Sequence, residues 1–192
     1  MSKILVIAEH LDGKLNPSTA RAVSAAAAVK PEAIDVLVLA DNTAALAAEA
    51  AKIEGVSRVL TVERTENAHP LAAVLAPQIA KAAAGYSHVF APSTTFGKDV
   101  TPRVAALLGV AQVSDVMSVE GTHSFKRPIY AGNAIVTVEA EPSHTVVATI
   151  RTASWSAAAS GANTAPVEAL TIDVPLPTHT RFVELNQGSS DR

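Results

Sequence analysis

Short apolar runs alternate with alanine-rich stretches along the first 110 residues, and this alternation constrains the fold more than any other feature. The apolar runs cover residues 4–8, 34–40, 56–62 and 88–91, and their length and composition are typical of strands covered on both faces. Between them lie stretches of helical length. Strand–helix alternation with short connections predicts right-handed crossovers and a parallel sheet. We therefore expect the α/β class, a three-layer αβα arrangement around a mainly parallel, Rossmann-like sheet.

Four helices are predicted between these strands, at residues 18–29, 44–53, 71–84, and from 99 or 101 to 108. Ser18 is the expected N-cap of the first, and the Lys-Pro pair at 30–31 ends it. Gly55, Gly85 and Gly109 are expected to end the others. Pro77 lies inside the third stretch, so that helix either starts late or is kinked. Pro102 would be tolerated in the first turn of the fourth.

The pattern changes after Gly109, where residues 113–119, 125–130, 134–140 and 145–150 read as strands with no helices between them. Gly132-Asn133 between two of these runs is a two-residue hairpin signal. We therefore expect one α/β domain over residues 1–152 with an added antiparallel segment from about residue 113. Residues 153–185 are expected to form an irregular extension with one strand at 167–174, packed on the same domain. The polar residues 186–192 resemble the start of a linker.

Composition excludes several classes of function. The chain has 192 residues and a net charge of −3, with no run of basic residues typical of nucleic-acid binding. It has no cysteine, which excludes disulfide scaffolds, thiolate metal sites, iron–sulfur clusters and cysteine nucleophiles. No apolar run has the length of a membrane span, and the first residues read as a strand and not as a signal peptide. We therefore expect a cytoplasmic protein.

Ligands of open α/β sheets bind at the carboxyl ends of the strands, which here are residues 8–13, 40–42 and 91–99. Neither a G-x-G-x-x-G nor a G-x-x-x-x-G-K-[ST] motif is present, so the sequence gives a nucleotide site little support. Glu9, His10 and Asp12 are candidates for an acid–base group or are simply charges of a solvated loop. The six histidines are at least 19 residues apart. We expect no metal site and no catalytic residue in this chain.

Two further groups of residues suggest binding to anions or to other proteins. Lys98 and Arg103 flank an expected helix N-terminus, which favours an anion, although both are equally well explained as ordinary exposed charges. Arg127, Tyr130 and Arg151, together with Trp155, are residue types that anchor interfaces. A hairpin with one packed aromatic explains them as well.

These stretches carry a resemblance to a known family, the amino-terminal domain of the electron transfer flavoprotein alpha subunit. The matching residues are the opening Ile4-Leu5-Val6-Ile7-Ala8-Glu9-His10, Phe96-Gly97-Lys98-Asp99 with Pro102-Arg103-Val104-Ala105, Val113-Ser114-Asp115-Val116, and residues 127–138 around Ile129-Tyr130-Ala131-Gly132-Asn133-Ala134. The stretch Arg151-Thr152-Ala153-Ser154-Trp155 also matches, although a glycine often follows the arginine in the family. The likeness covers nearly the whole chain.

The resemblance implies a heterodimer of alpha and beta subunits that carries electrons on FAD. The electrons come from flavoprotein dehydrogenases, such as the acyl-CoA dehydrogenases of fatty acid oxidation, and pass to a membrane quinone oxidoreductase. In the family a second alpha domain supplies most FAD contacts, and AMP is bound only in the beta partner. The motifs of that second domain are absent from this sequence, so no flavin ligand is expected within these residues.

On this interpretation the chain is a scaffold that docks the beta subunit. The residues expected to face the beta subunit or the flavin domain are Lys98, Arg103, Arg127, Tyr130 and Arg151. One alternative is a stand-alone adenine-nucleotide-binding module of similar fold, with AMP or ATP held at residues 91–99. Another is a homo-oligomer assembled through its antiparallel edge.

Overall fold

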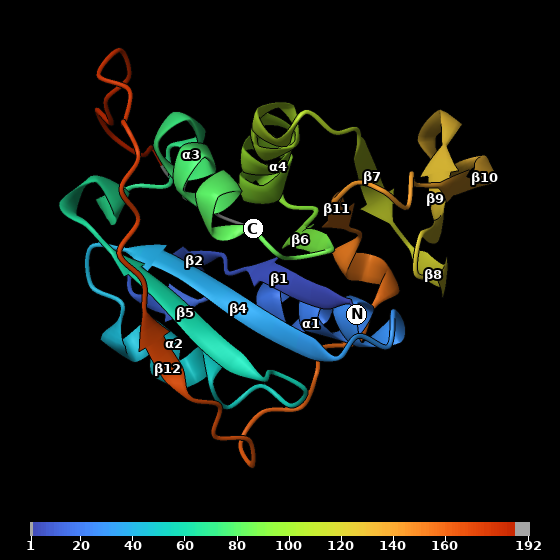
Figure 1. Ribbon diagram of the computed structural model, residues 1–192, viewed down its shortest axis with the longest axis horizontal. Coiled ribbons are helices and arrows are strands. Elements are labelled where there is room, and N and C mark those ends of the chain that lie inside the picture. The colour runs from blue at the N-terminus through green and yellow to red at the C-terminus, as the bar shows by residue number, and fades with distance from the viewer. Residues whose placement is uncertain (1, 187–192) are drawn as a thin grey trace, which may run out of the picture.

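A seven-stranded, all-parallel sheet forms the middle layer of the computed structural model, which describes residues 2–186 (Figure 1). All six strand pairings in this sheet are parallel. The expected α/β class and three-layer arrangement are confirmed. In spatial order the strands are β12 (Val167–Ala169), β5 (Arg58–Glu63), β4 (Ala33–Ala40), β1 (Lys3–Ile7), β6 (His88–Pro92), β11 (Val146–Ile150) and β7 (Gln112–Val116).

Helices cover both faces of this sheet because both faces are apolar. On one face α1 (Ser18–Ala28) and α2 (Ala44–Ala50) pack with Ile4 and Val6, while on the other α3 (Ala72–Ala82) and α4 (Thr95–Leu108) pack with Leu5 and Ile7. These four residues of β1 are at most 1% exposed. Alternate side chains of β1 thus pack against the two outer helical layers. Three short 3₁₀ segments complete the helical elements: η1 (Thr65–Ala68), η2 (Tyr130–Gly132) and η3 (Thr152–Ser154).

The antiparallel part is a separate sheet of three strands, β8 (Ser118–Gly121), β9 (Ser124–Ile129) and β10 (Ala134–Glu139), which projects from one side of the domain (Figure 1). The sequence-based assignment to this segment was wrong for residues 113–116 and 145–150. The run 113–119 divides at Met117 into β7 and β8, and β7 and β11 both join the parallel sheet.

The small sheet takes the place of a crossover helix between β7 and β11. Its buried Phe125 belongs to the same apolar cluster as Phe90 of β6 and the α1 side chains, so it extends the cover that α1 provides on this face of the parallel sheet. His88 of β6 joins the two sheets, because its Nε2 lies 2.7 Å from the carbonyl oxygen of Thr122 between β8 and β9. Its other ring nitrogen, Nδ1, lies 2.8 Å from Oγ of the adjacent Ser87. Burial lowers the pKa of His88, and neutral His88 satisfies both contacts when Nε2–H donates to Thr122.

Helix starts and ends differ from the sequence-based predictions where a side chain or proline acts locally. Helix α4 begins at Thr95, about one turn earlier than expected, because the Thr94 hydroxyl accepts a hydrogen bond from the Gly97 N–H at 3.3 Å. Pro102 therefore lies in the helix interior and not in its first turn. Ser18 is the first residue of α1 and not its cap, and Pro77 lies within α3, which still begins at Ala72.

Two further differences are shorter elements and a hairpin that was not predicted. Helix α2 ends at Ala50 instead of residue 53, and β12 covers only Val167–Ala169 of the run 167–174. The hairpin β2 (His10–Leu11) and β3 (Lys14–Leu15) follows β1. The hairpin predicted at Gly132-Asn133 does join β9 to β10, through residues 130–133 and η2. Apart from Asn186, the predicted linker at residues 186–192 lies outside the described residues.

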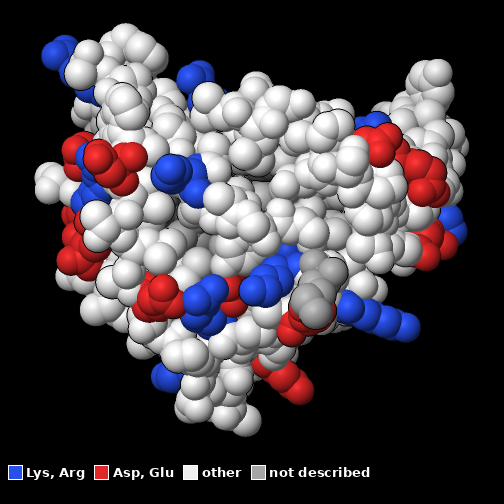
Figure 2. All heavy atoms as spheres, viewed as in Figure 1, with Lys and Arg blue, Asp and Glu red and all other residues white. Residues whose placement is uncertain are grey.

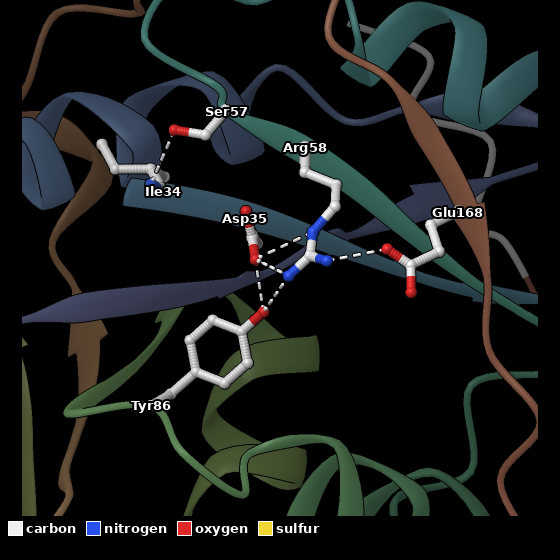
Figure 3. Close-up of polar contacts among 6 residues, drawn as sticks. All are labelled: Ile34, Asp35, Ser57, Arg58, Tyr86 and Glu168. Carbon is white, nitrogen blue, oxygen red and sulfur yellow. Dashed lines mark hydrogen bonds and ion pairs between the residues drawn. The ribbon is translucent and has the colours of Figure 1, made fainter. Parts of the chain in front are cut away.

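An ion-pair cluster at the amino ends of the strands joins four segments that are far apart in the sequence (Figure 3). Arg58 donates to Asp35 Oδ2 from Nη2 at 2.7 Å and to Glu168 Oε2 from Nη1 at 2.7 Å. Tyr86 donates its hydroxyl to Asp35 Oδ2. The Asp35 side chain is 3% exposed, so the cluster satisfies a buried carboxylate while it ties β12 to the edge of the sheet.

Charged side chains of both signs are interspersed on the face shown in Figure 2, and the described residues form no continuous basic area there. The same view shows wide stretches without lysine, arginine, aspartate or glutamate. This distribution offers no electrostatic footprint for a nucleic acid on that face.

The Tyr86 hydroxyl gives a direct test of the ion-pair cluster. We expect Tyr86→Phe to lower the free energy of unfolding by about 1.5–3 kcal/mol, because Asp35 loses a charge-assisted hydrogen bond in a buried position. Urea denaturation measures the change. Tyr130→Phe is the matched control, since Tyr130 is 78% exposed and is the other tyrosine of the two in the chain. Equal stability of both variants and the wild type would contradict the assignment.

Burial, followed by the hydrogen bond to Asp35, raises the pKa of Tyr86 above its ordinary value of 10. A pKa raised on folding stabilises the protein below the unfolded value and loses this contribution as the pH rises toward the folded one. In the Tyr130→Phe variant, alkaline titration of the tyrosine absorbance reports Tyr86 alone. Its midpoint is expected above pH 10 for as long as the chain stays folded.

Candidate functional site

The chain leaves β1 and its neighbour β6 toward opposite faces of the sheet, so the carboxyl ends of these two strands form a topological switch point, and the place between them is called the crevice below. From β1 the chain passes to α1 on one face, and from β6 it passes to α4 on the other. Such a switch point is where open α/β sheets hold ligands, with anions at the helix N-termini. The crevice between β1 and β6 is therefore the first candidate site.

Glu9, which follows β1, occupies this crevice. Its Oε2 accepts hydrogen bonds from Ser18 Oγ at 2.8 Å and from Thr94 Oγ1 at 2.9 Å. Ser18 is the first residue of α1 and Thr94 is the N-cap of α4. A carboxylate of the protein itself thus lies where the N-termini of two helices converge.

The backbone of Glu9 is held as firmly as its side chain. Its N–H donates to Thr19 Oγ1 at 3.1 Å, and its carbonyl accepts from the Asn16 N–H at 2.8 Å. The Thr94 hydroxyl that donates to Glu9 also accepts from Gly97, so the carboxylate is linked to the first turn of α4.

The acid–base group considered from the sequence is not assembled. His10 is directed away from Glu9 toward the β4 side, where its Nε2 lies 2.8 Å from the Leu39 carbonyl oxygen. Asp12 is exposed in the β2–β3 turn, and no hydrogen bond or ion pair joins it to Glu9 or His10. The actual partners of Glu9, Ser18 and Thr94, are 9 and 85 residues away in the sequence, and no local spacing indicated them.

A cavity of about 600 Å³ lies beside the crevice, on the β1–β4 side of the carboxyl edge. Its polar side chains come mainly from acids, histidines and an asparagine, and no lysine or arginine lines it. The C-terminal segment forms part of its wall, where the Phe182 ring stacks on His69 with centroids 3.6 Å apart. The polar lining residues are His10, Asp12, Asp41, Asn42 and His69. This cavity suits an apolar or flat uncharged group and disfavours an anion.

The loop singled out at residues 96–99 is the first turn of α4, and its glycine serves helix packing. A Cβ on Gly97 would lie 1.8 Å from the Pro92 carbonyl oxygen, so the helix can rest against the end of β6 only without a side chain there. Lys98 and Arg103 are exposed on α4. Arg103 lines a shallow groove together with the C-terminal residues Pro175 and His179.

Two of the other three interface candidates meet at β7. Arg127 donates to the Ser114 carbonyl oxygen at 2.7 Å and to Ser114 Oγ at 2.9 Å, while Arg151 pairs with Asp115 Oδ2 at 2.7 Å. Asp115 has a left-handed φ of 60°, and this bend presents its carboxylate to Arg151. Both arginines thus have structural roles, whatever else they contact.

Tyr130 lies instead at the tip of the small sheet, and its side chain is 78% exposed. Tyr130, Ala131 and Gly132 all have positive φ values, of 50°, 55° and 93°. A non-glycine residue in this region carries backbone strain, and such strain concentrates at functional loops. The five candidates therefore fall into separate places: α4, the β7 region and the tip of the small sheet.

Two findings concern metals and membranes. Within residues 2–186, no three histidine, aspartate or glutamate side chains gather as the ligands of a metal ion would. No helix in this part of the chain is both long and apolar enough to cross a bilayer.

Comparison with known proteins gives one consistent family. The family described as the electron transfer flavoprotein domain matches residues 4–175. The chain is 48% identical over 165 residues to the electron transfer flavoprotein subunit alpha of Pseudomonas aeruginosa, covering 86% of this chain and 53% of that protein. It is 47% identical over 167 residues to the subunit alpha of Paracoccus denitrificans (85% and 52%) and 38% identical over 173 residues to the mitochondrial subunit alpha of Dictyostelium discoideum (86% and 48%). The chain thus spans about half the length of these relatives.

Gly97 gives a test of the packing at the carboxyl edge. We expect Gly97→Ala to lower the free energy of unfolding by about 3 kcal/mol, the upper end of the usual cost of overpacking, because backbone must move to admit the methyl group. Gly121→Ala is the control, since the nearest atom to its added Cβ, Ser124 Cβ, lies at 3.7 Å. Urea denaturation of the two variants should separate them, and equal midpoints would show that α4 does not depend on this contact.

Proposed function

The chain belongs to the electron transfer flavoprotein family as a relative of its alpha subunits, and from this premise we propose that it forms the scaffold and beta-subunit-docking part of such a subunit. The role of the chain is accordingly in electron transfer, as part of a carrier and not as a classical enzyme. The observation that carries the proposal is the family match over residues 4–175. At the carboxyl ends of β1 and β6, the hydroxyls of Ser18 and Thr94 are engaged by Glu9.

The described residues do not fit the phosphates of FAD or AMP at the carboxyl edge. Such a phosphate needs free donors at helix N-termini or basic side chains. Here the hydroxyls of Ser18 and Thr94 donate to Glu9, and the neighbouring cavity has Asp12 and Asp41 but no lysine or arginine in its lining. We therefore derive no step through a nucleotide cofactor bound here. The proposal places FAD mainly in the part of the alpha subunits that this chain does not match, and AMP in the beta subunit.

The small antiparallel sheet is the proposed docking surface for the beta subunit. It exposes Tyr130 at its tip and Ile135 on β10, which are 78% and 57% exposed. Exposed aromatic side chains on a defined loop are typical anchors of interfaces. Arg127 and Arg151 hold β7 beneath this sheet through Ser114 and Asp115, so they support the surface even where they do not touch the partner.

Lys98 and Arg103, exposed on α4, are assigned to a different contact in this proposal, namely that with the flavin-binding region. The groove at Arg103 already receives the C-terminal segment through Pro175, Leu176, Pro177 and His179.

The partners and location of the whole carrier follow from the family as proposals. Electrons would be received from flavoprotein dehydrogenases, such as acyl-CoA dehydrogenases, and passed through a quinone oxidoreductase toward the respiratory chain. FAD would supply the redox chemistry, and these residues would fix the relative positions of the subunits. The location proposed is the cytoplasm, although some relatives are named as mitochondrial proteins.

A stand-alone adenine-nucleotide module of similar fold is the second candidate, because open α/β sheets bind ligands at the carboxyl ends of their strands. It would have to bind AMP or ATP at residues 91–99, where Thr94 is engaged with Glu9 and Gly97 is pressed against Pro92. Isothermal titration with AMP and ATP separates the candidates, since saturable binding by the wild-type chain supports the module.

The docking proposal is tested with a purified electron transfer flavoprotein beta subunit. The chain is expected to form a complex of one copy of each, and Tyr130→Ala is expected to weaken it at least about tenfold, as loss of an interface anchor does. Leu107→Ala on α4 is the matched control, because Leu107 is also a large exposed side chain, at 54%, but lies outside the small sheet. Titration calorimetry gives both affinities. Failure to form a complex, or weakening by Leu107→Ala alone, would contradict the proposed surface.

A further inference from the structure

We propose that Glu9 is a built-in anion that closes the switch-point crevice of this domain to nucleotide phosphates. It is thus a specificity-determining residue, one that decides what the crevice does not bind. No ligand is assigned to this position in the wild-type chain.

The first argument is the position of the carboxylate. Ser18 and Thr94 stand at the starts of α1 and α4, helices of 11 and 14 residues on opposite faces of the sheet, and both hydroxyls donate to the same oxygen of Glu9. A phosphate bound between the two helix N-termini would use the same donors and the same space. Binding of one anion therefore excludes the other.

The second argument is electrostatic. A phosphate brought next to Glu9 would meet a like charge at short range, in a half-buried place where repulsion is weakly screened. Asp12 and Asp41 line the adjoining cavity, and no lysine or arginine lies among its lining residues. Ligands that need an anion site are thus rejected both by volume and by charge.

The third argument is the rigidity of Glu9. Hydrogen bonds to Thr19 and Asn16 hold its backbone on both sides of the Cα, so the carboxylate is directed into the crevice and does not need to be ordered by a ligand. Rotation of the side chain out of the crevice would leave the two hydroxyls without their acceptor. The Glu9 carboxylate thus takes the place of a bound anion, but it is covalently part of the chain.

Removal of the Glu9 carboxylate is therefore expected to create an anion site. In Glu9→Ala the hydroxyls of Ser18 and Thr94 and the converging helix N-termini would remain, with space between them. Inorganic phosphate at tens of millimolar is then expected to raise the melting temperature of Glu9→Ala by about 2–4 °C more than sodium chloride of equal ionic strength. The wild type is expected to respond equally to both salts.

Two further variants make the test specific. Glu49→Ala removes another carboxylate, which accepts the Leu15 N–H at 3.1 Å from within α2, and it should respond to the two salts as the wild type does. Glu9→Gln keeps an acceptor oxygen and loses only the charge, so it is expected to fold and to show a phosphate effect between those of the wild type and Glu9→Ala. Should Glu9→Ala not fold, the comparison of Glu9→Gln with the wild type decides the matter.

Two results would overturn the inference. One is a phosphate-specific stabilisation of the wild type as large as that of the Glu9 variants, which would mean that the carboxylate does not close the crevice. The other is the absence of any phosphate-specific effect in both Glu9 variants, which would mean that no anion position exists behind it. Both measurements use the chain without its beta partner, so they are independent of the docking proposal.

Discussion

A parallel sheet must have both faces covered, and this requirement organises the whole chain. The alternating side chains of β1 divide the apolar residues into two clusters, one under α1 and α2 and the other under α3 and α4. Beside α1, the small antiparallel sheet supplies Phe125 to the same cluster. Because the covering elements leave β1 and β6 toward opposite faces, a crevice between these two strands is a consequence of the packing and does not need a function to explain it.

What fills the crevice is therefore informative. In this chain the hydroxyls of Ser18 and Thr94, at the starts of α1 and α4, both donate to Glu9, so the place where related folds hold a ligand has become an internal hydrogen-bonded joint between the two helical layers. At the amino ends of the strands, a second polar cluster joins separate segments in the same manner; it consists of Asp35, Arg58, Tyr86 and Glu168 (Figure 3). Polar side chains thus hold separate segments of the domain together at both ends of the strands, and a domain that supports partners requires such stability.

The sequence predicted the α/β class and four helices because the periodicity of apolar residues and the prolines and glycines that end helices and strands are local signals. It could not predict that β7 and β11 join the parallel sheet, because strand pairing depends on contacts between segments that are far apart in the sequence. Likewise the early start of α4 depends on one hydroxyl, that of Thr94, whose role is visible only when Glu9 and Gly97 are beside it. The residues Lys98, Arg103, Arg127, Tyr130 and Arg151 were found by their types, but their separation into three places is a property of the fold.

If these residues support an electron carrier without holding its flavin, the isolated chain must be free of FAD, and its flavin content is the decisive measurement. The 192-residue chain is to be produced in cells, purified without its partner, and examined by its visible absorption spectrum and by flavin released on denaturation. We expect a colourless protein that neither retains FAD nor takes it up on incubation. A yellow protein with one FAD per chain would contradict it, because the flavin would then be held by the same residues that are described here as a scaffold.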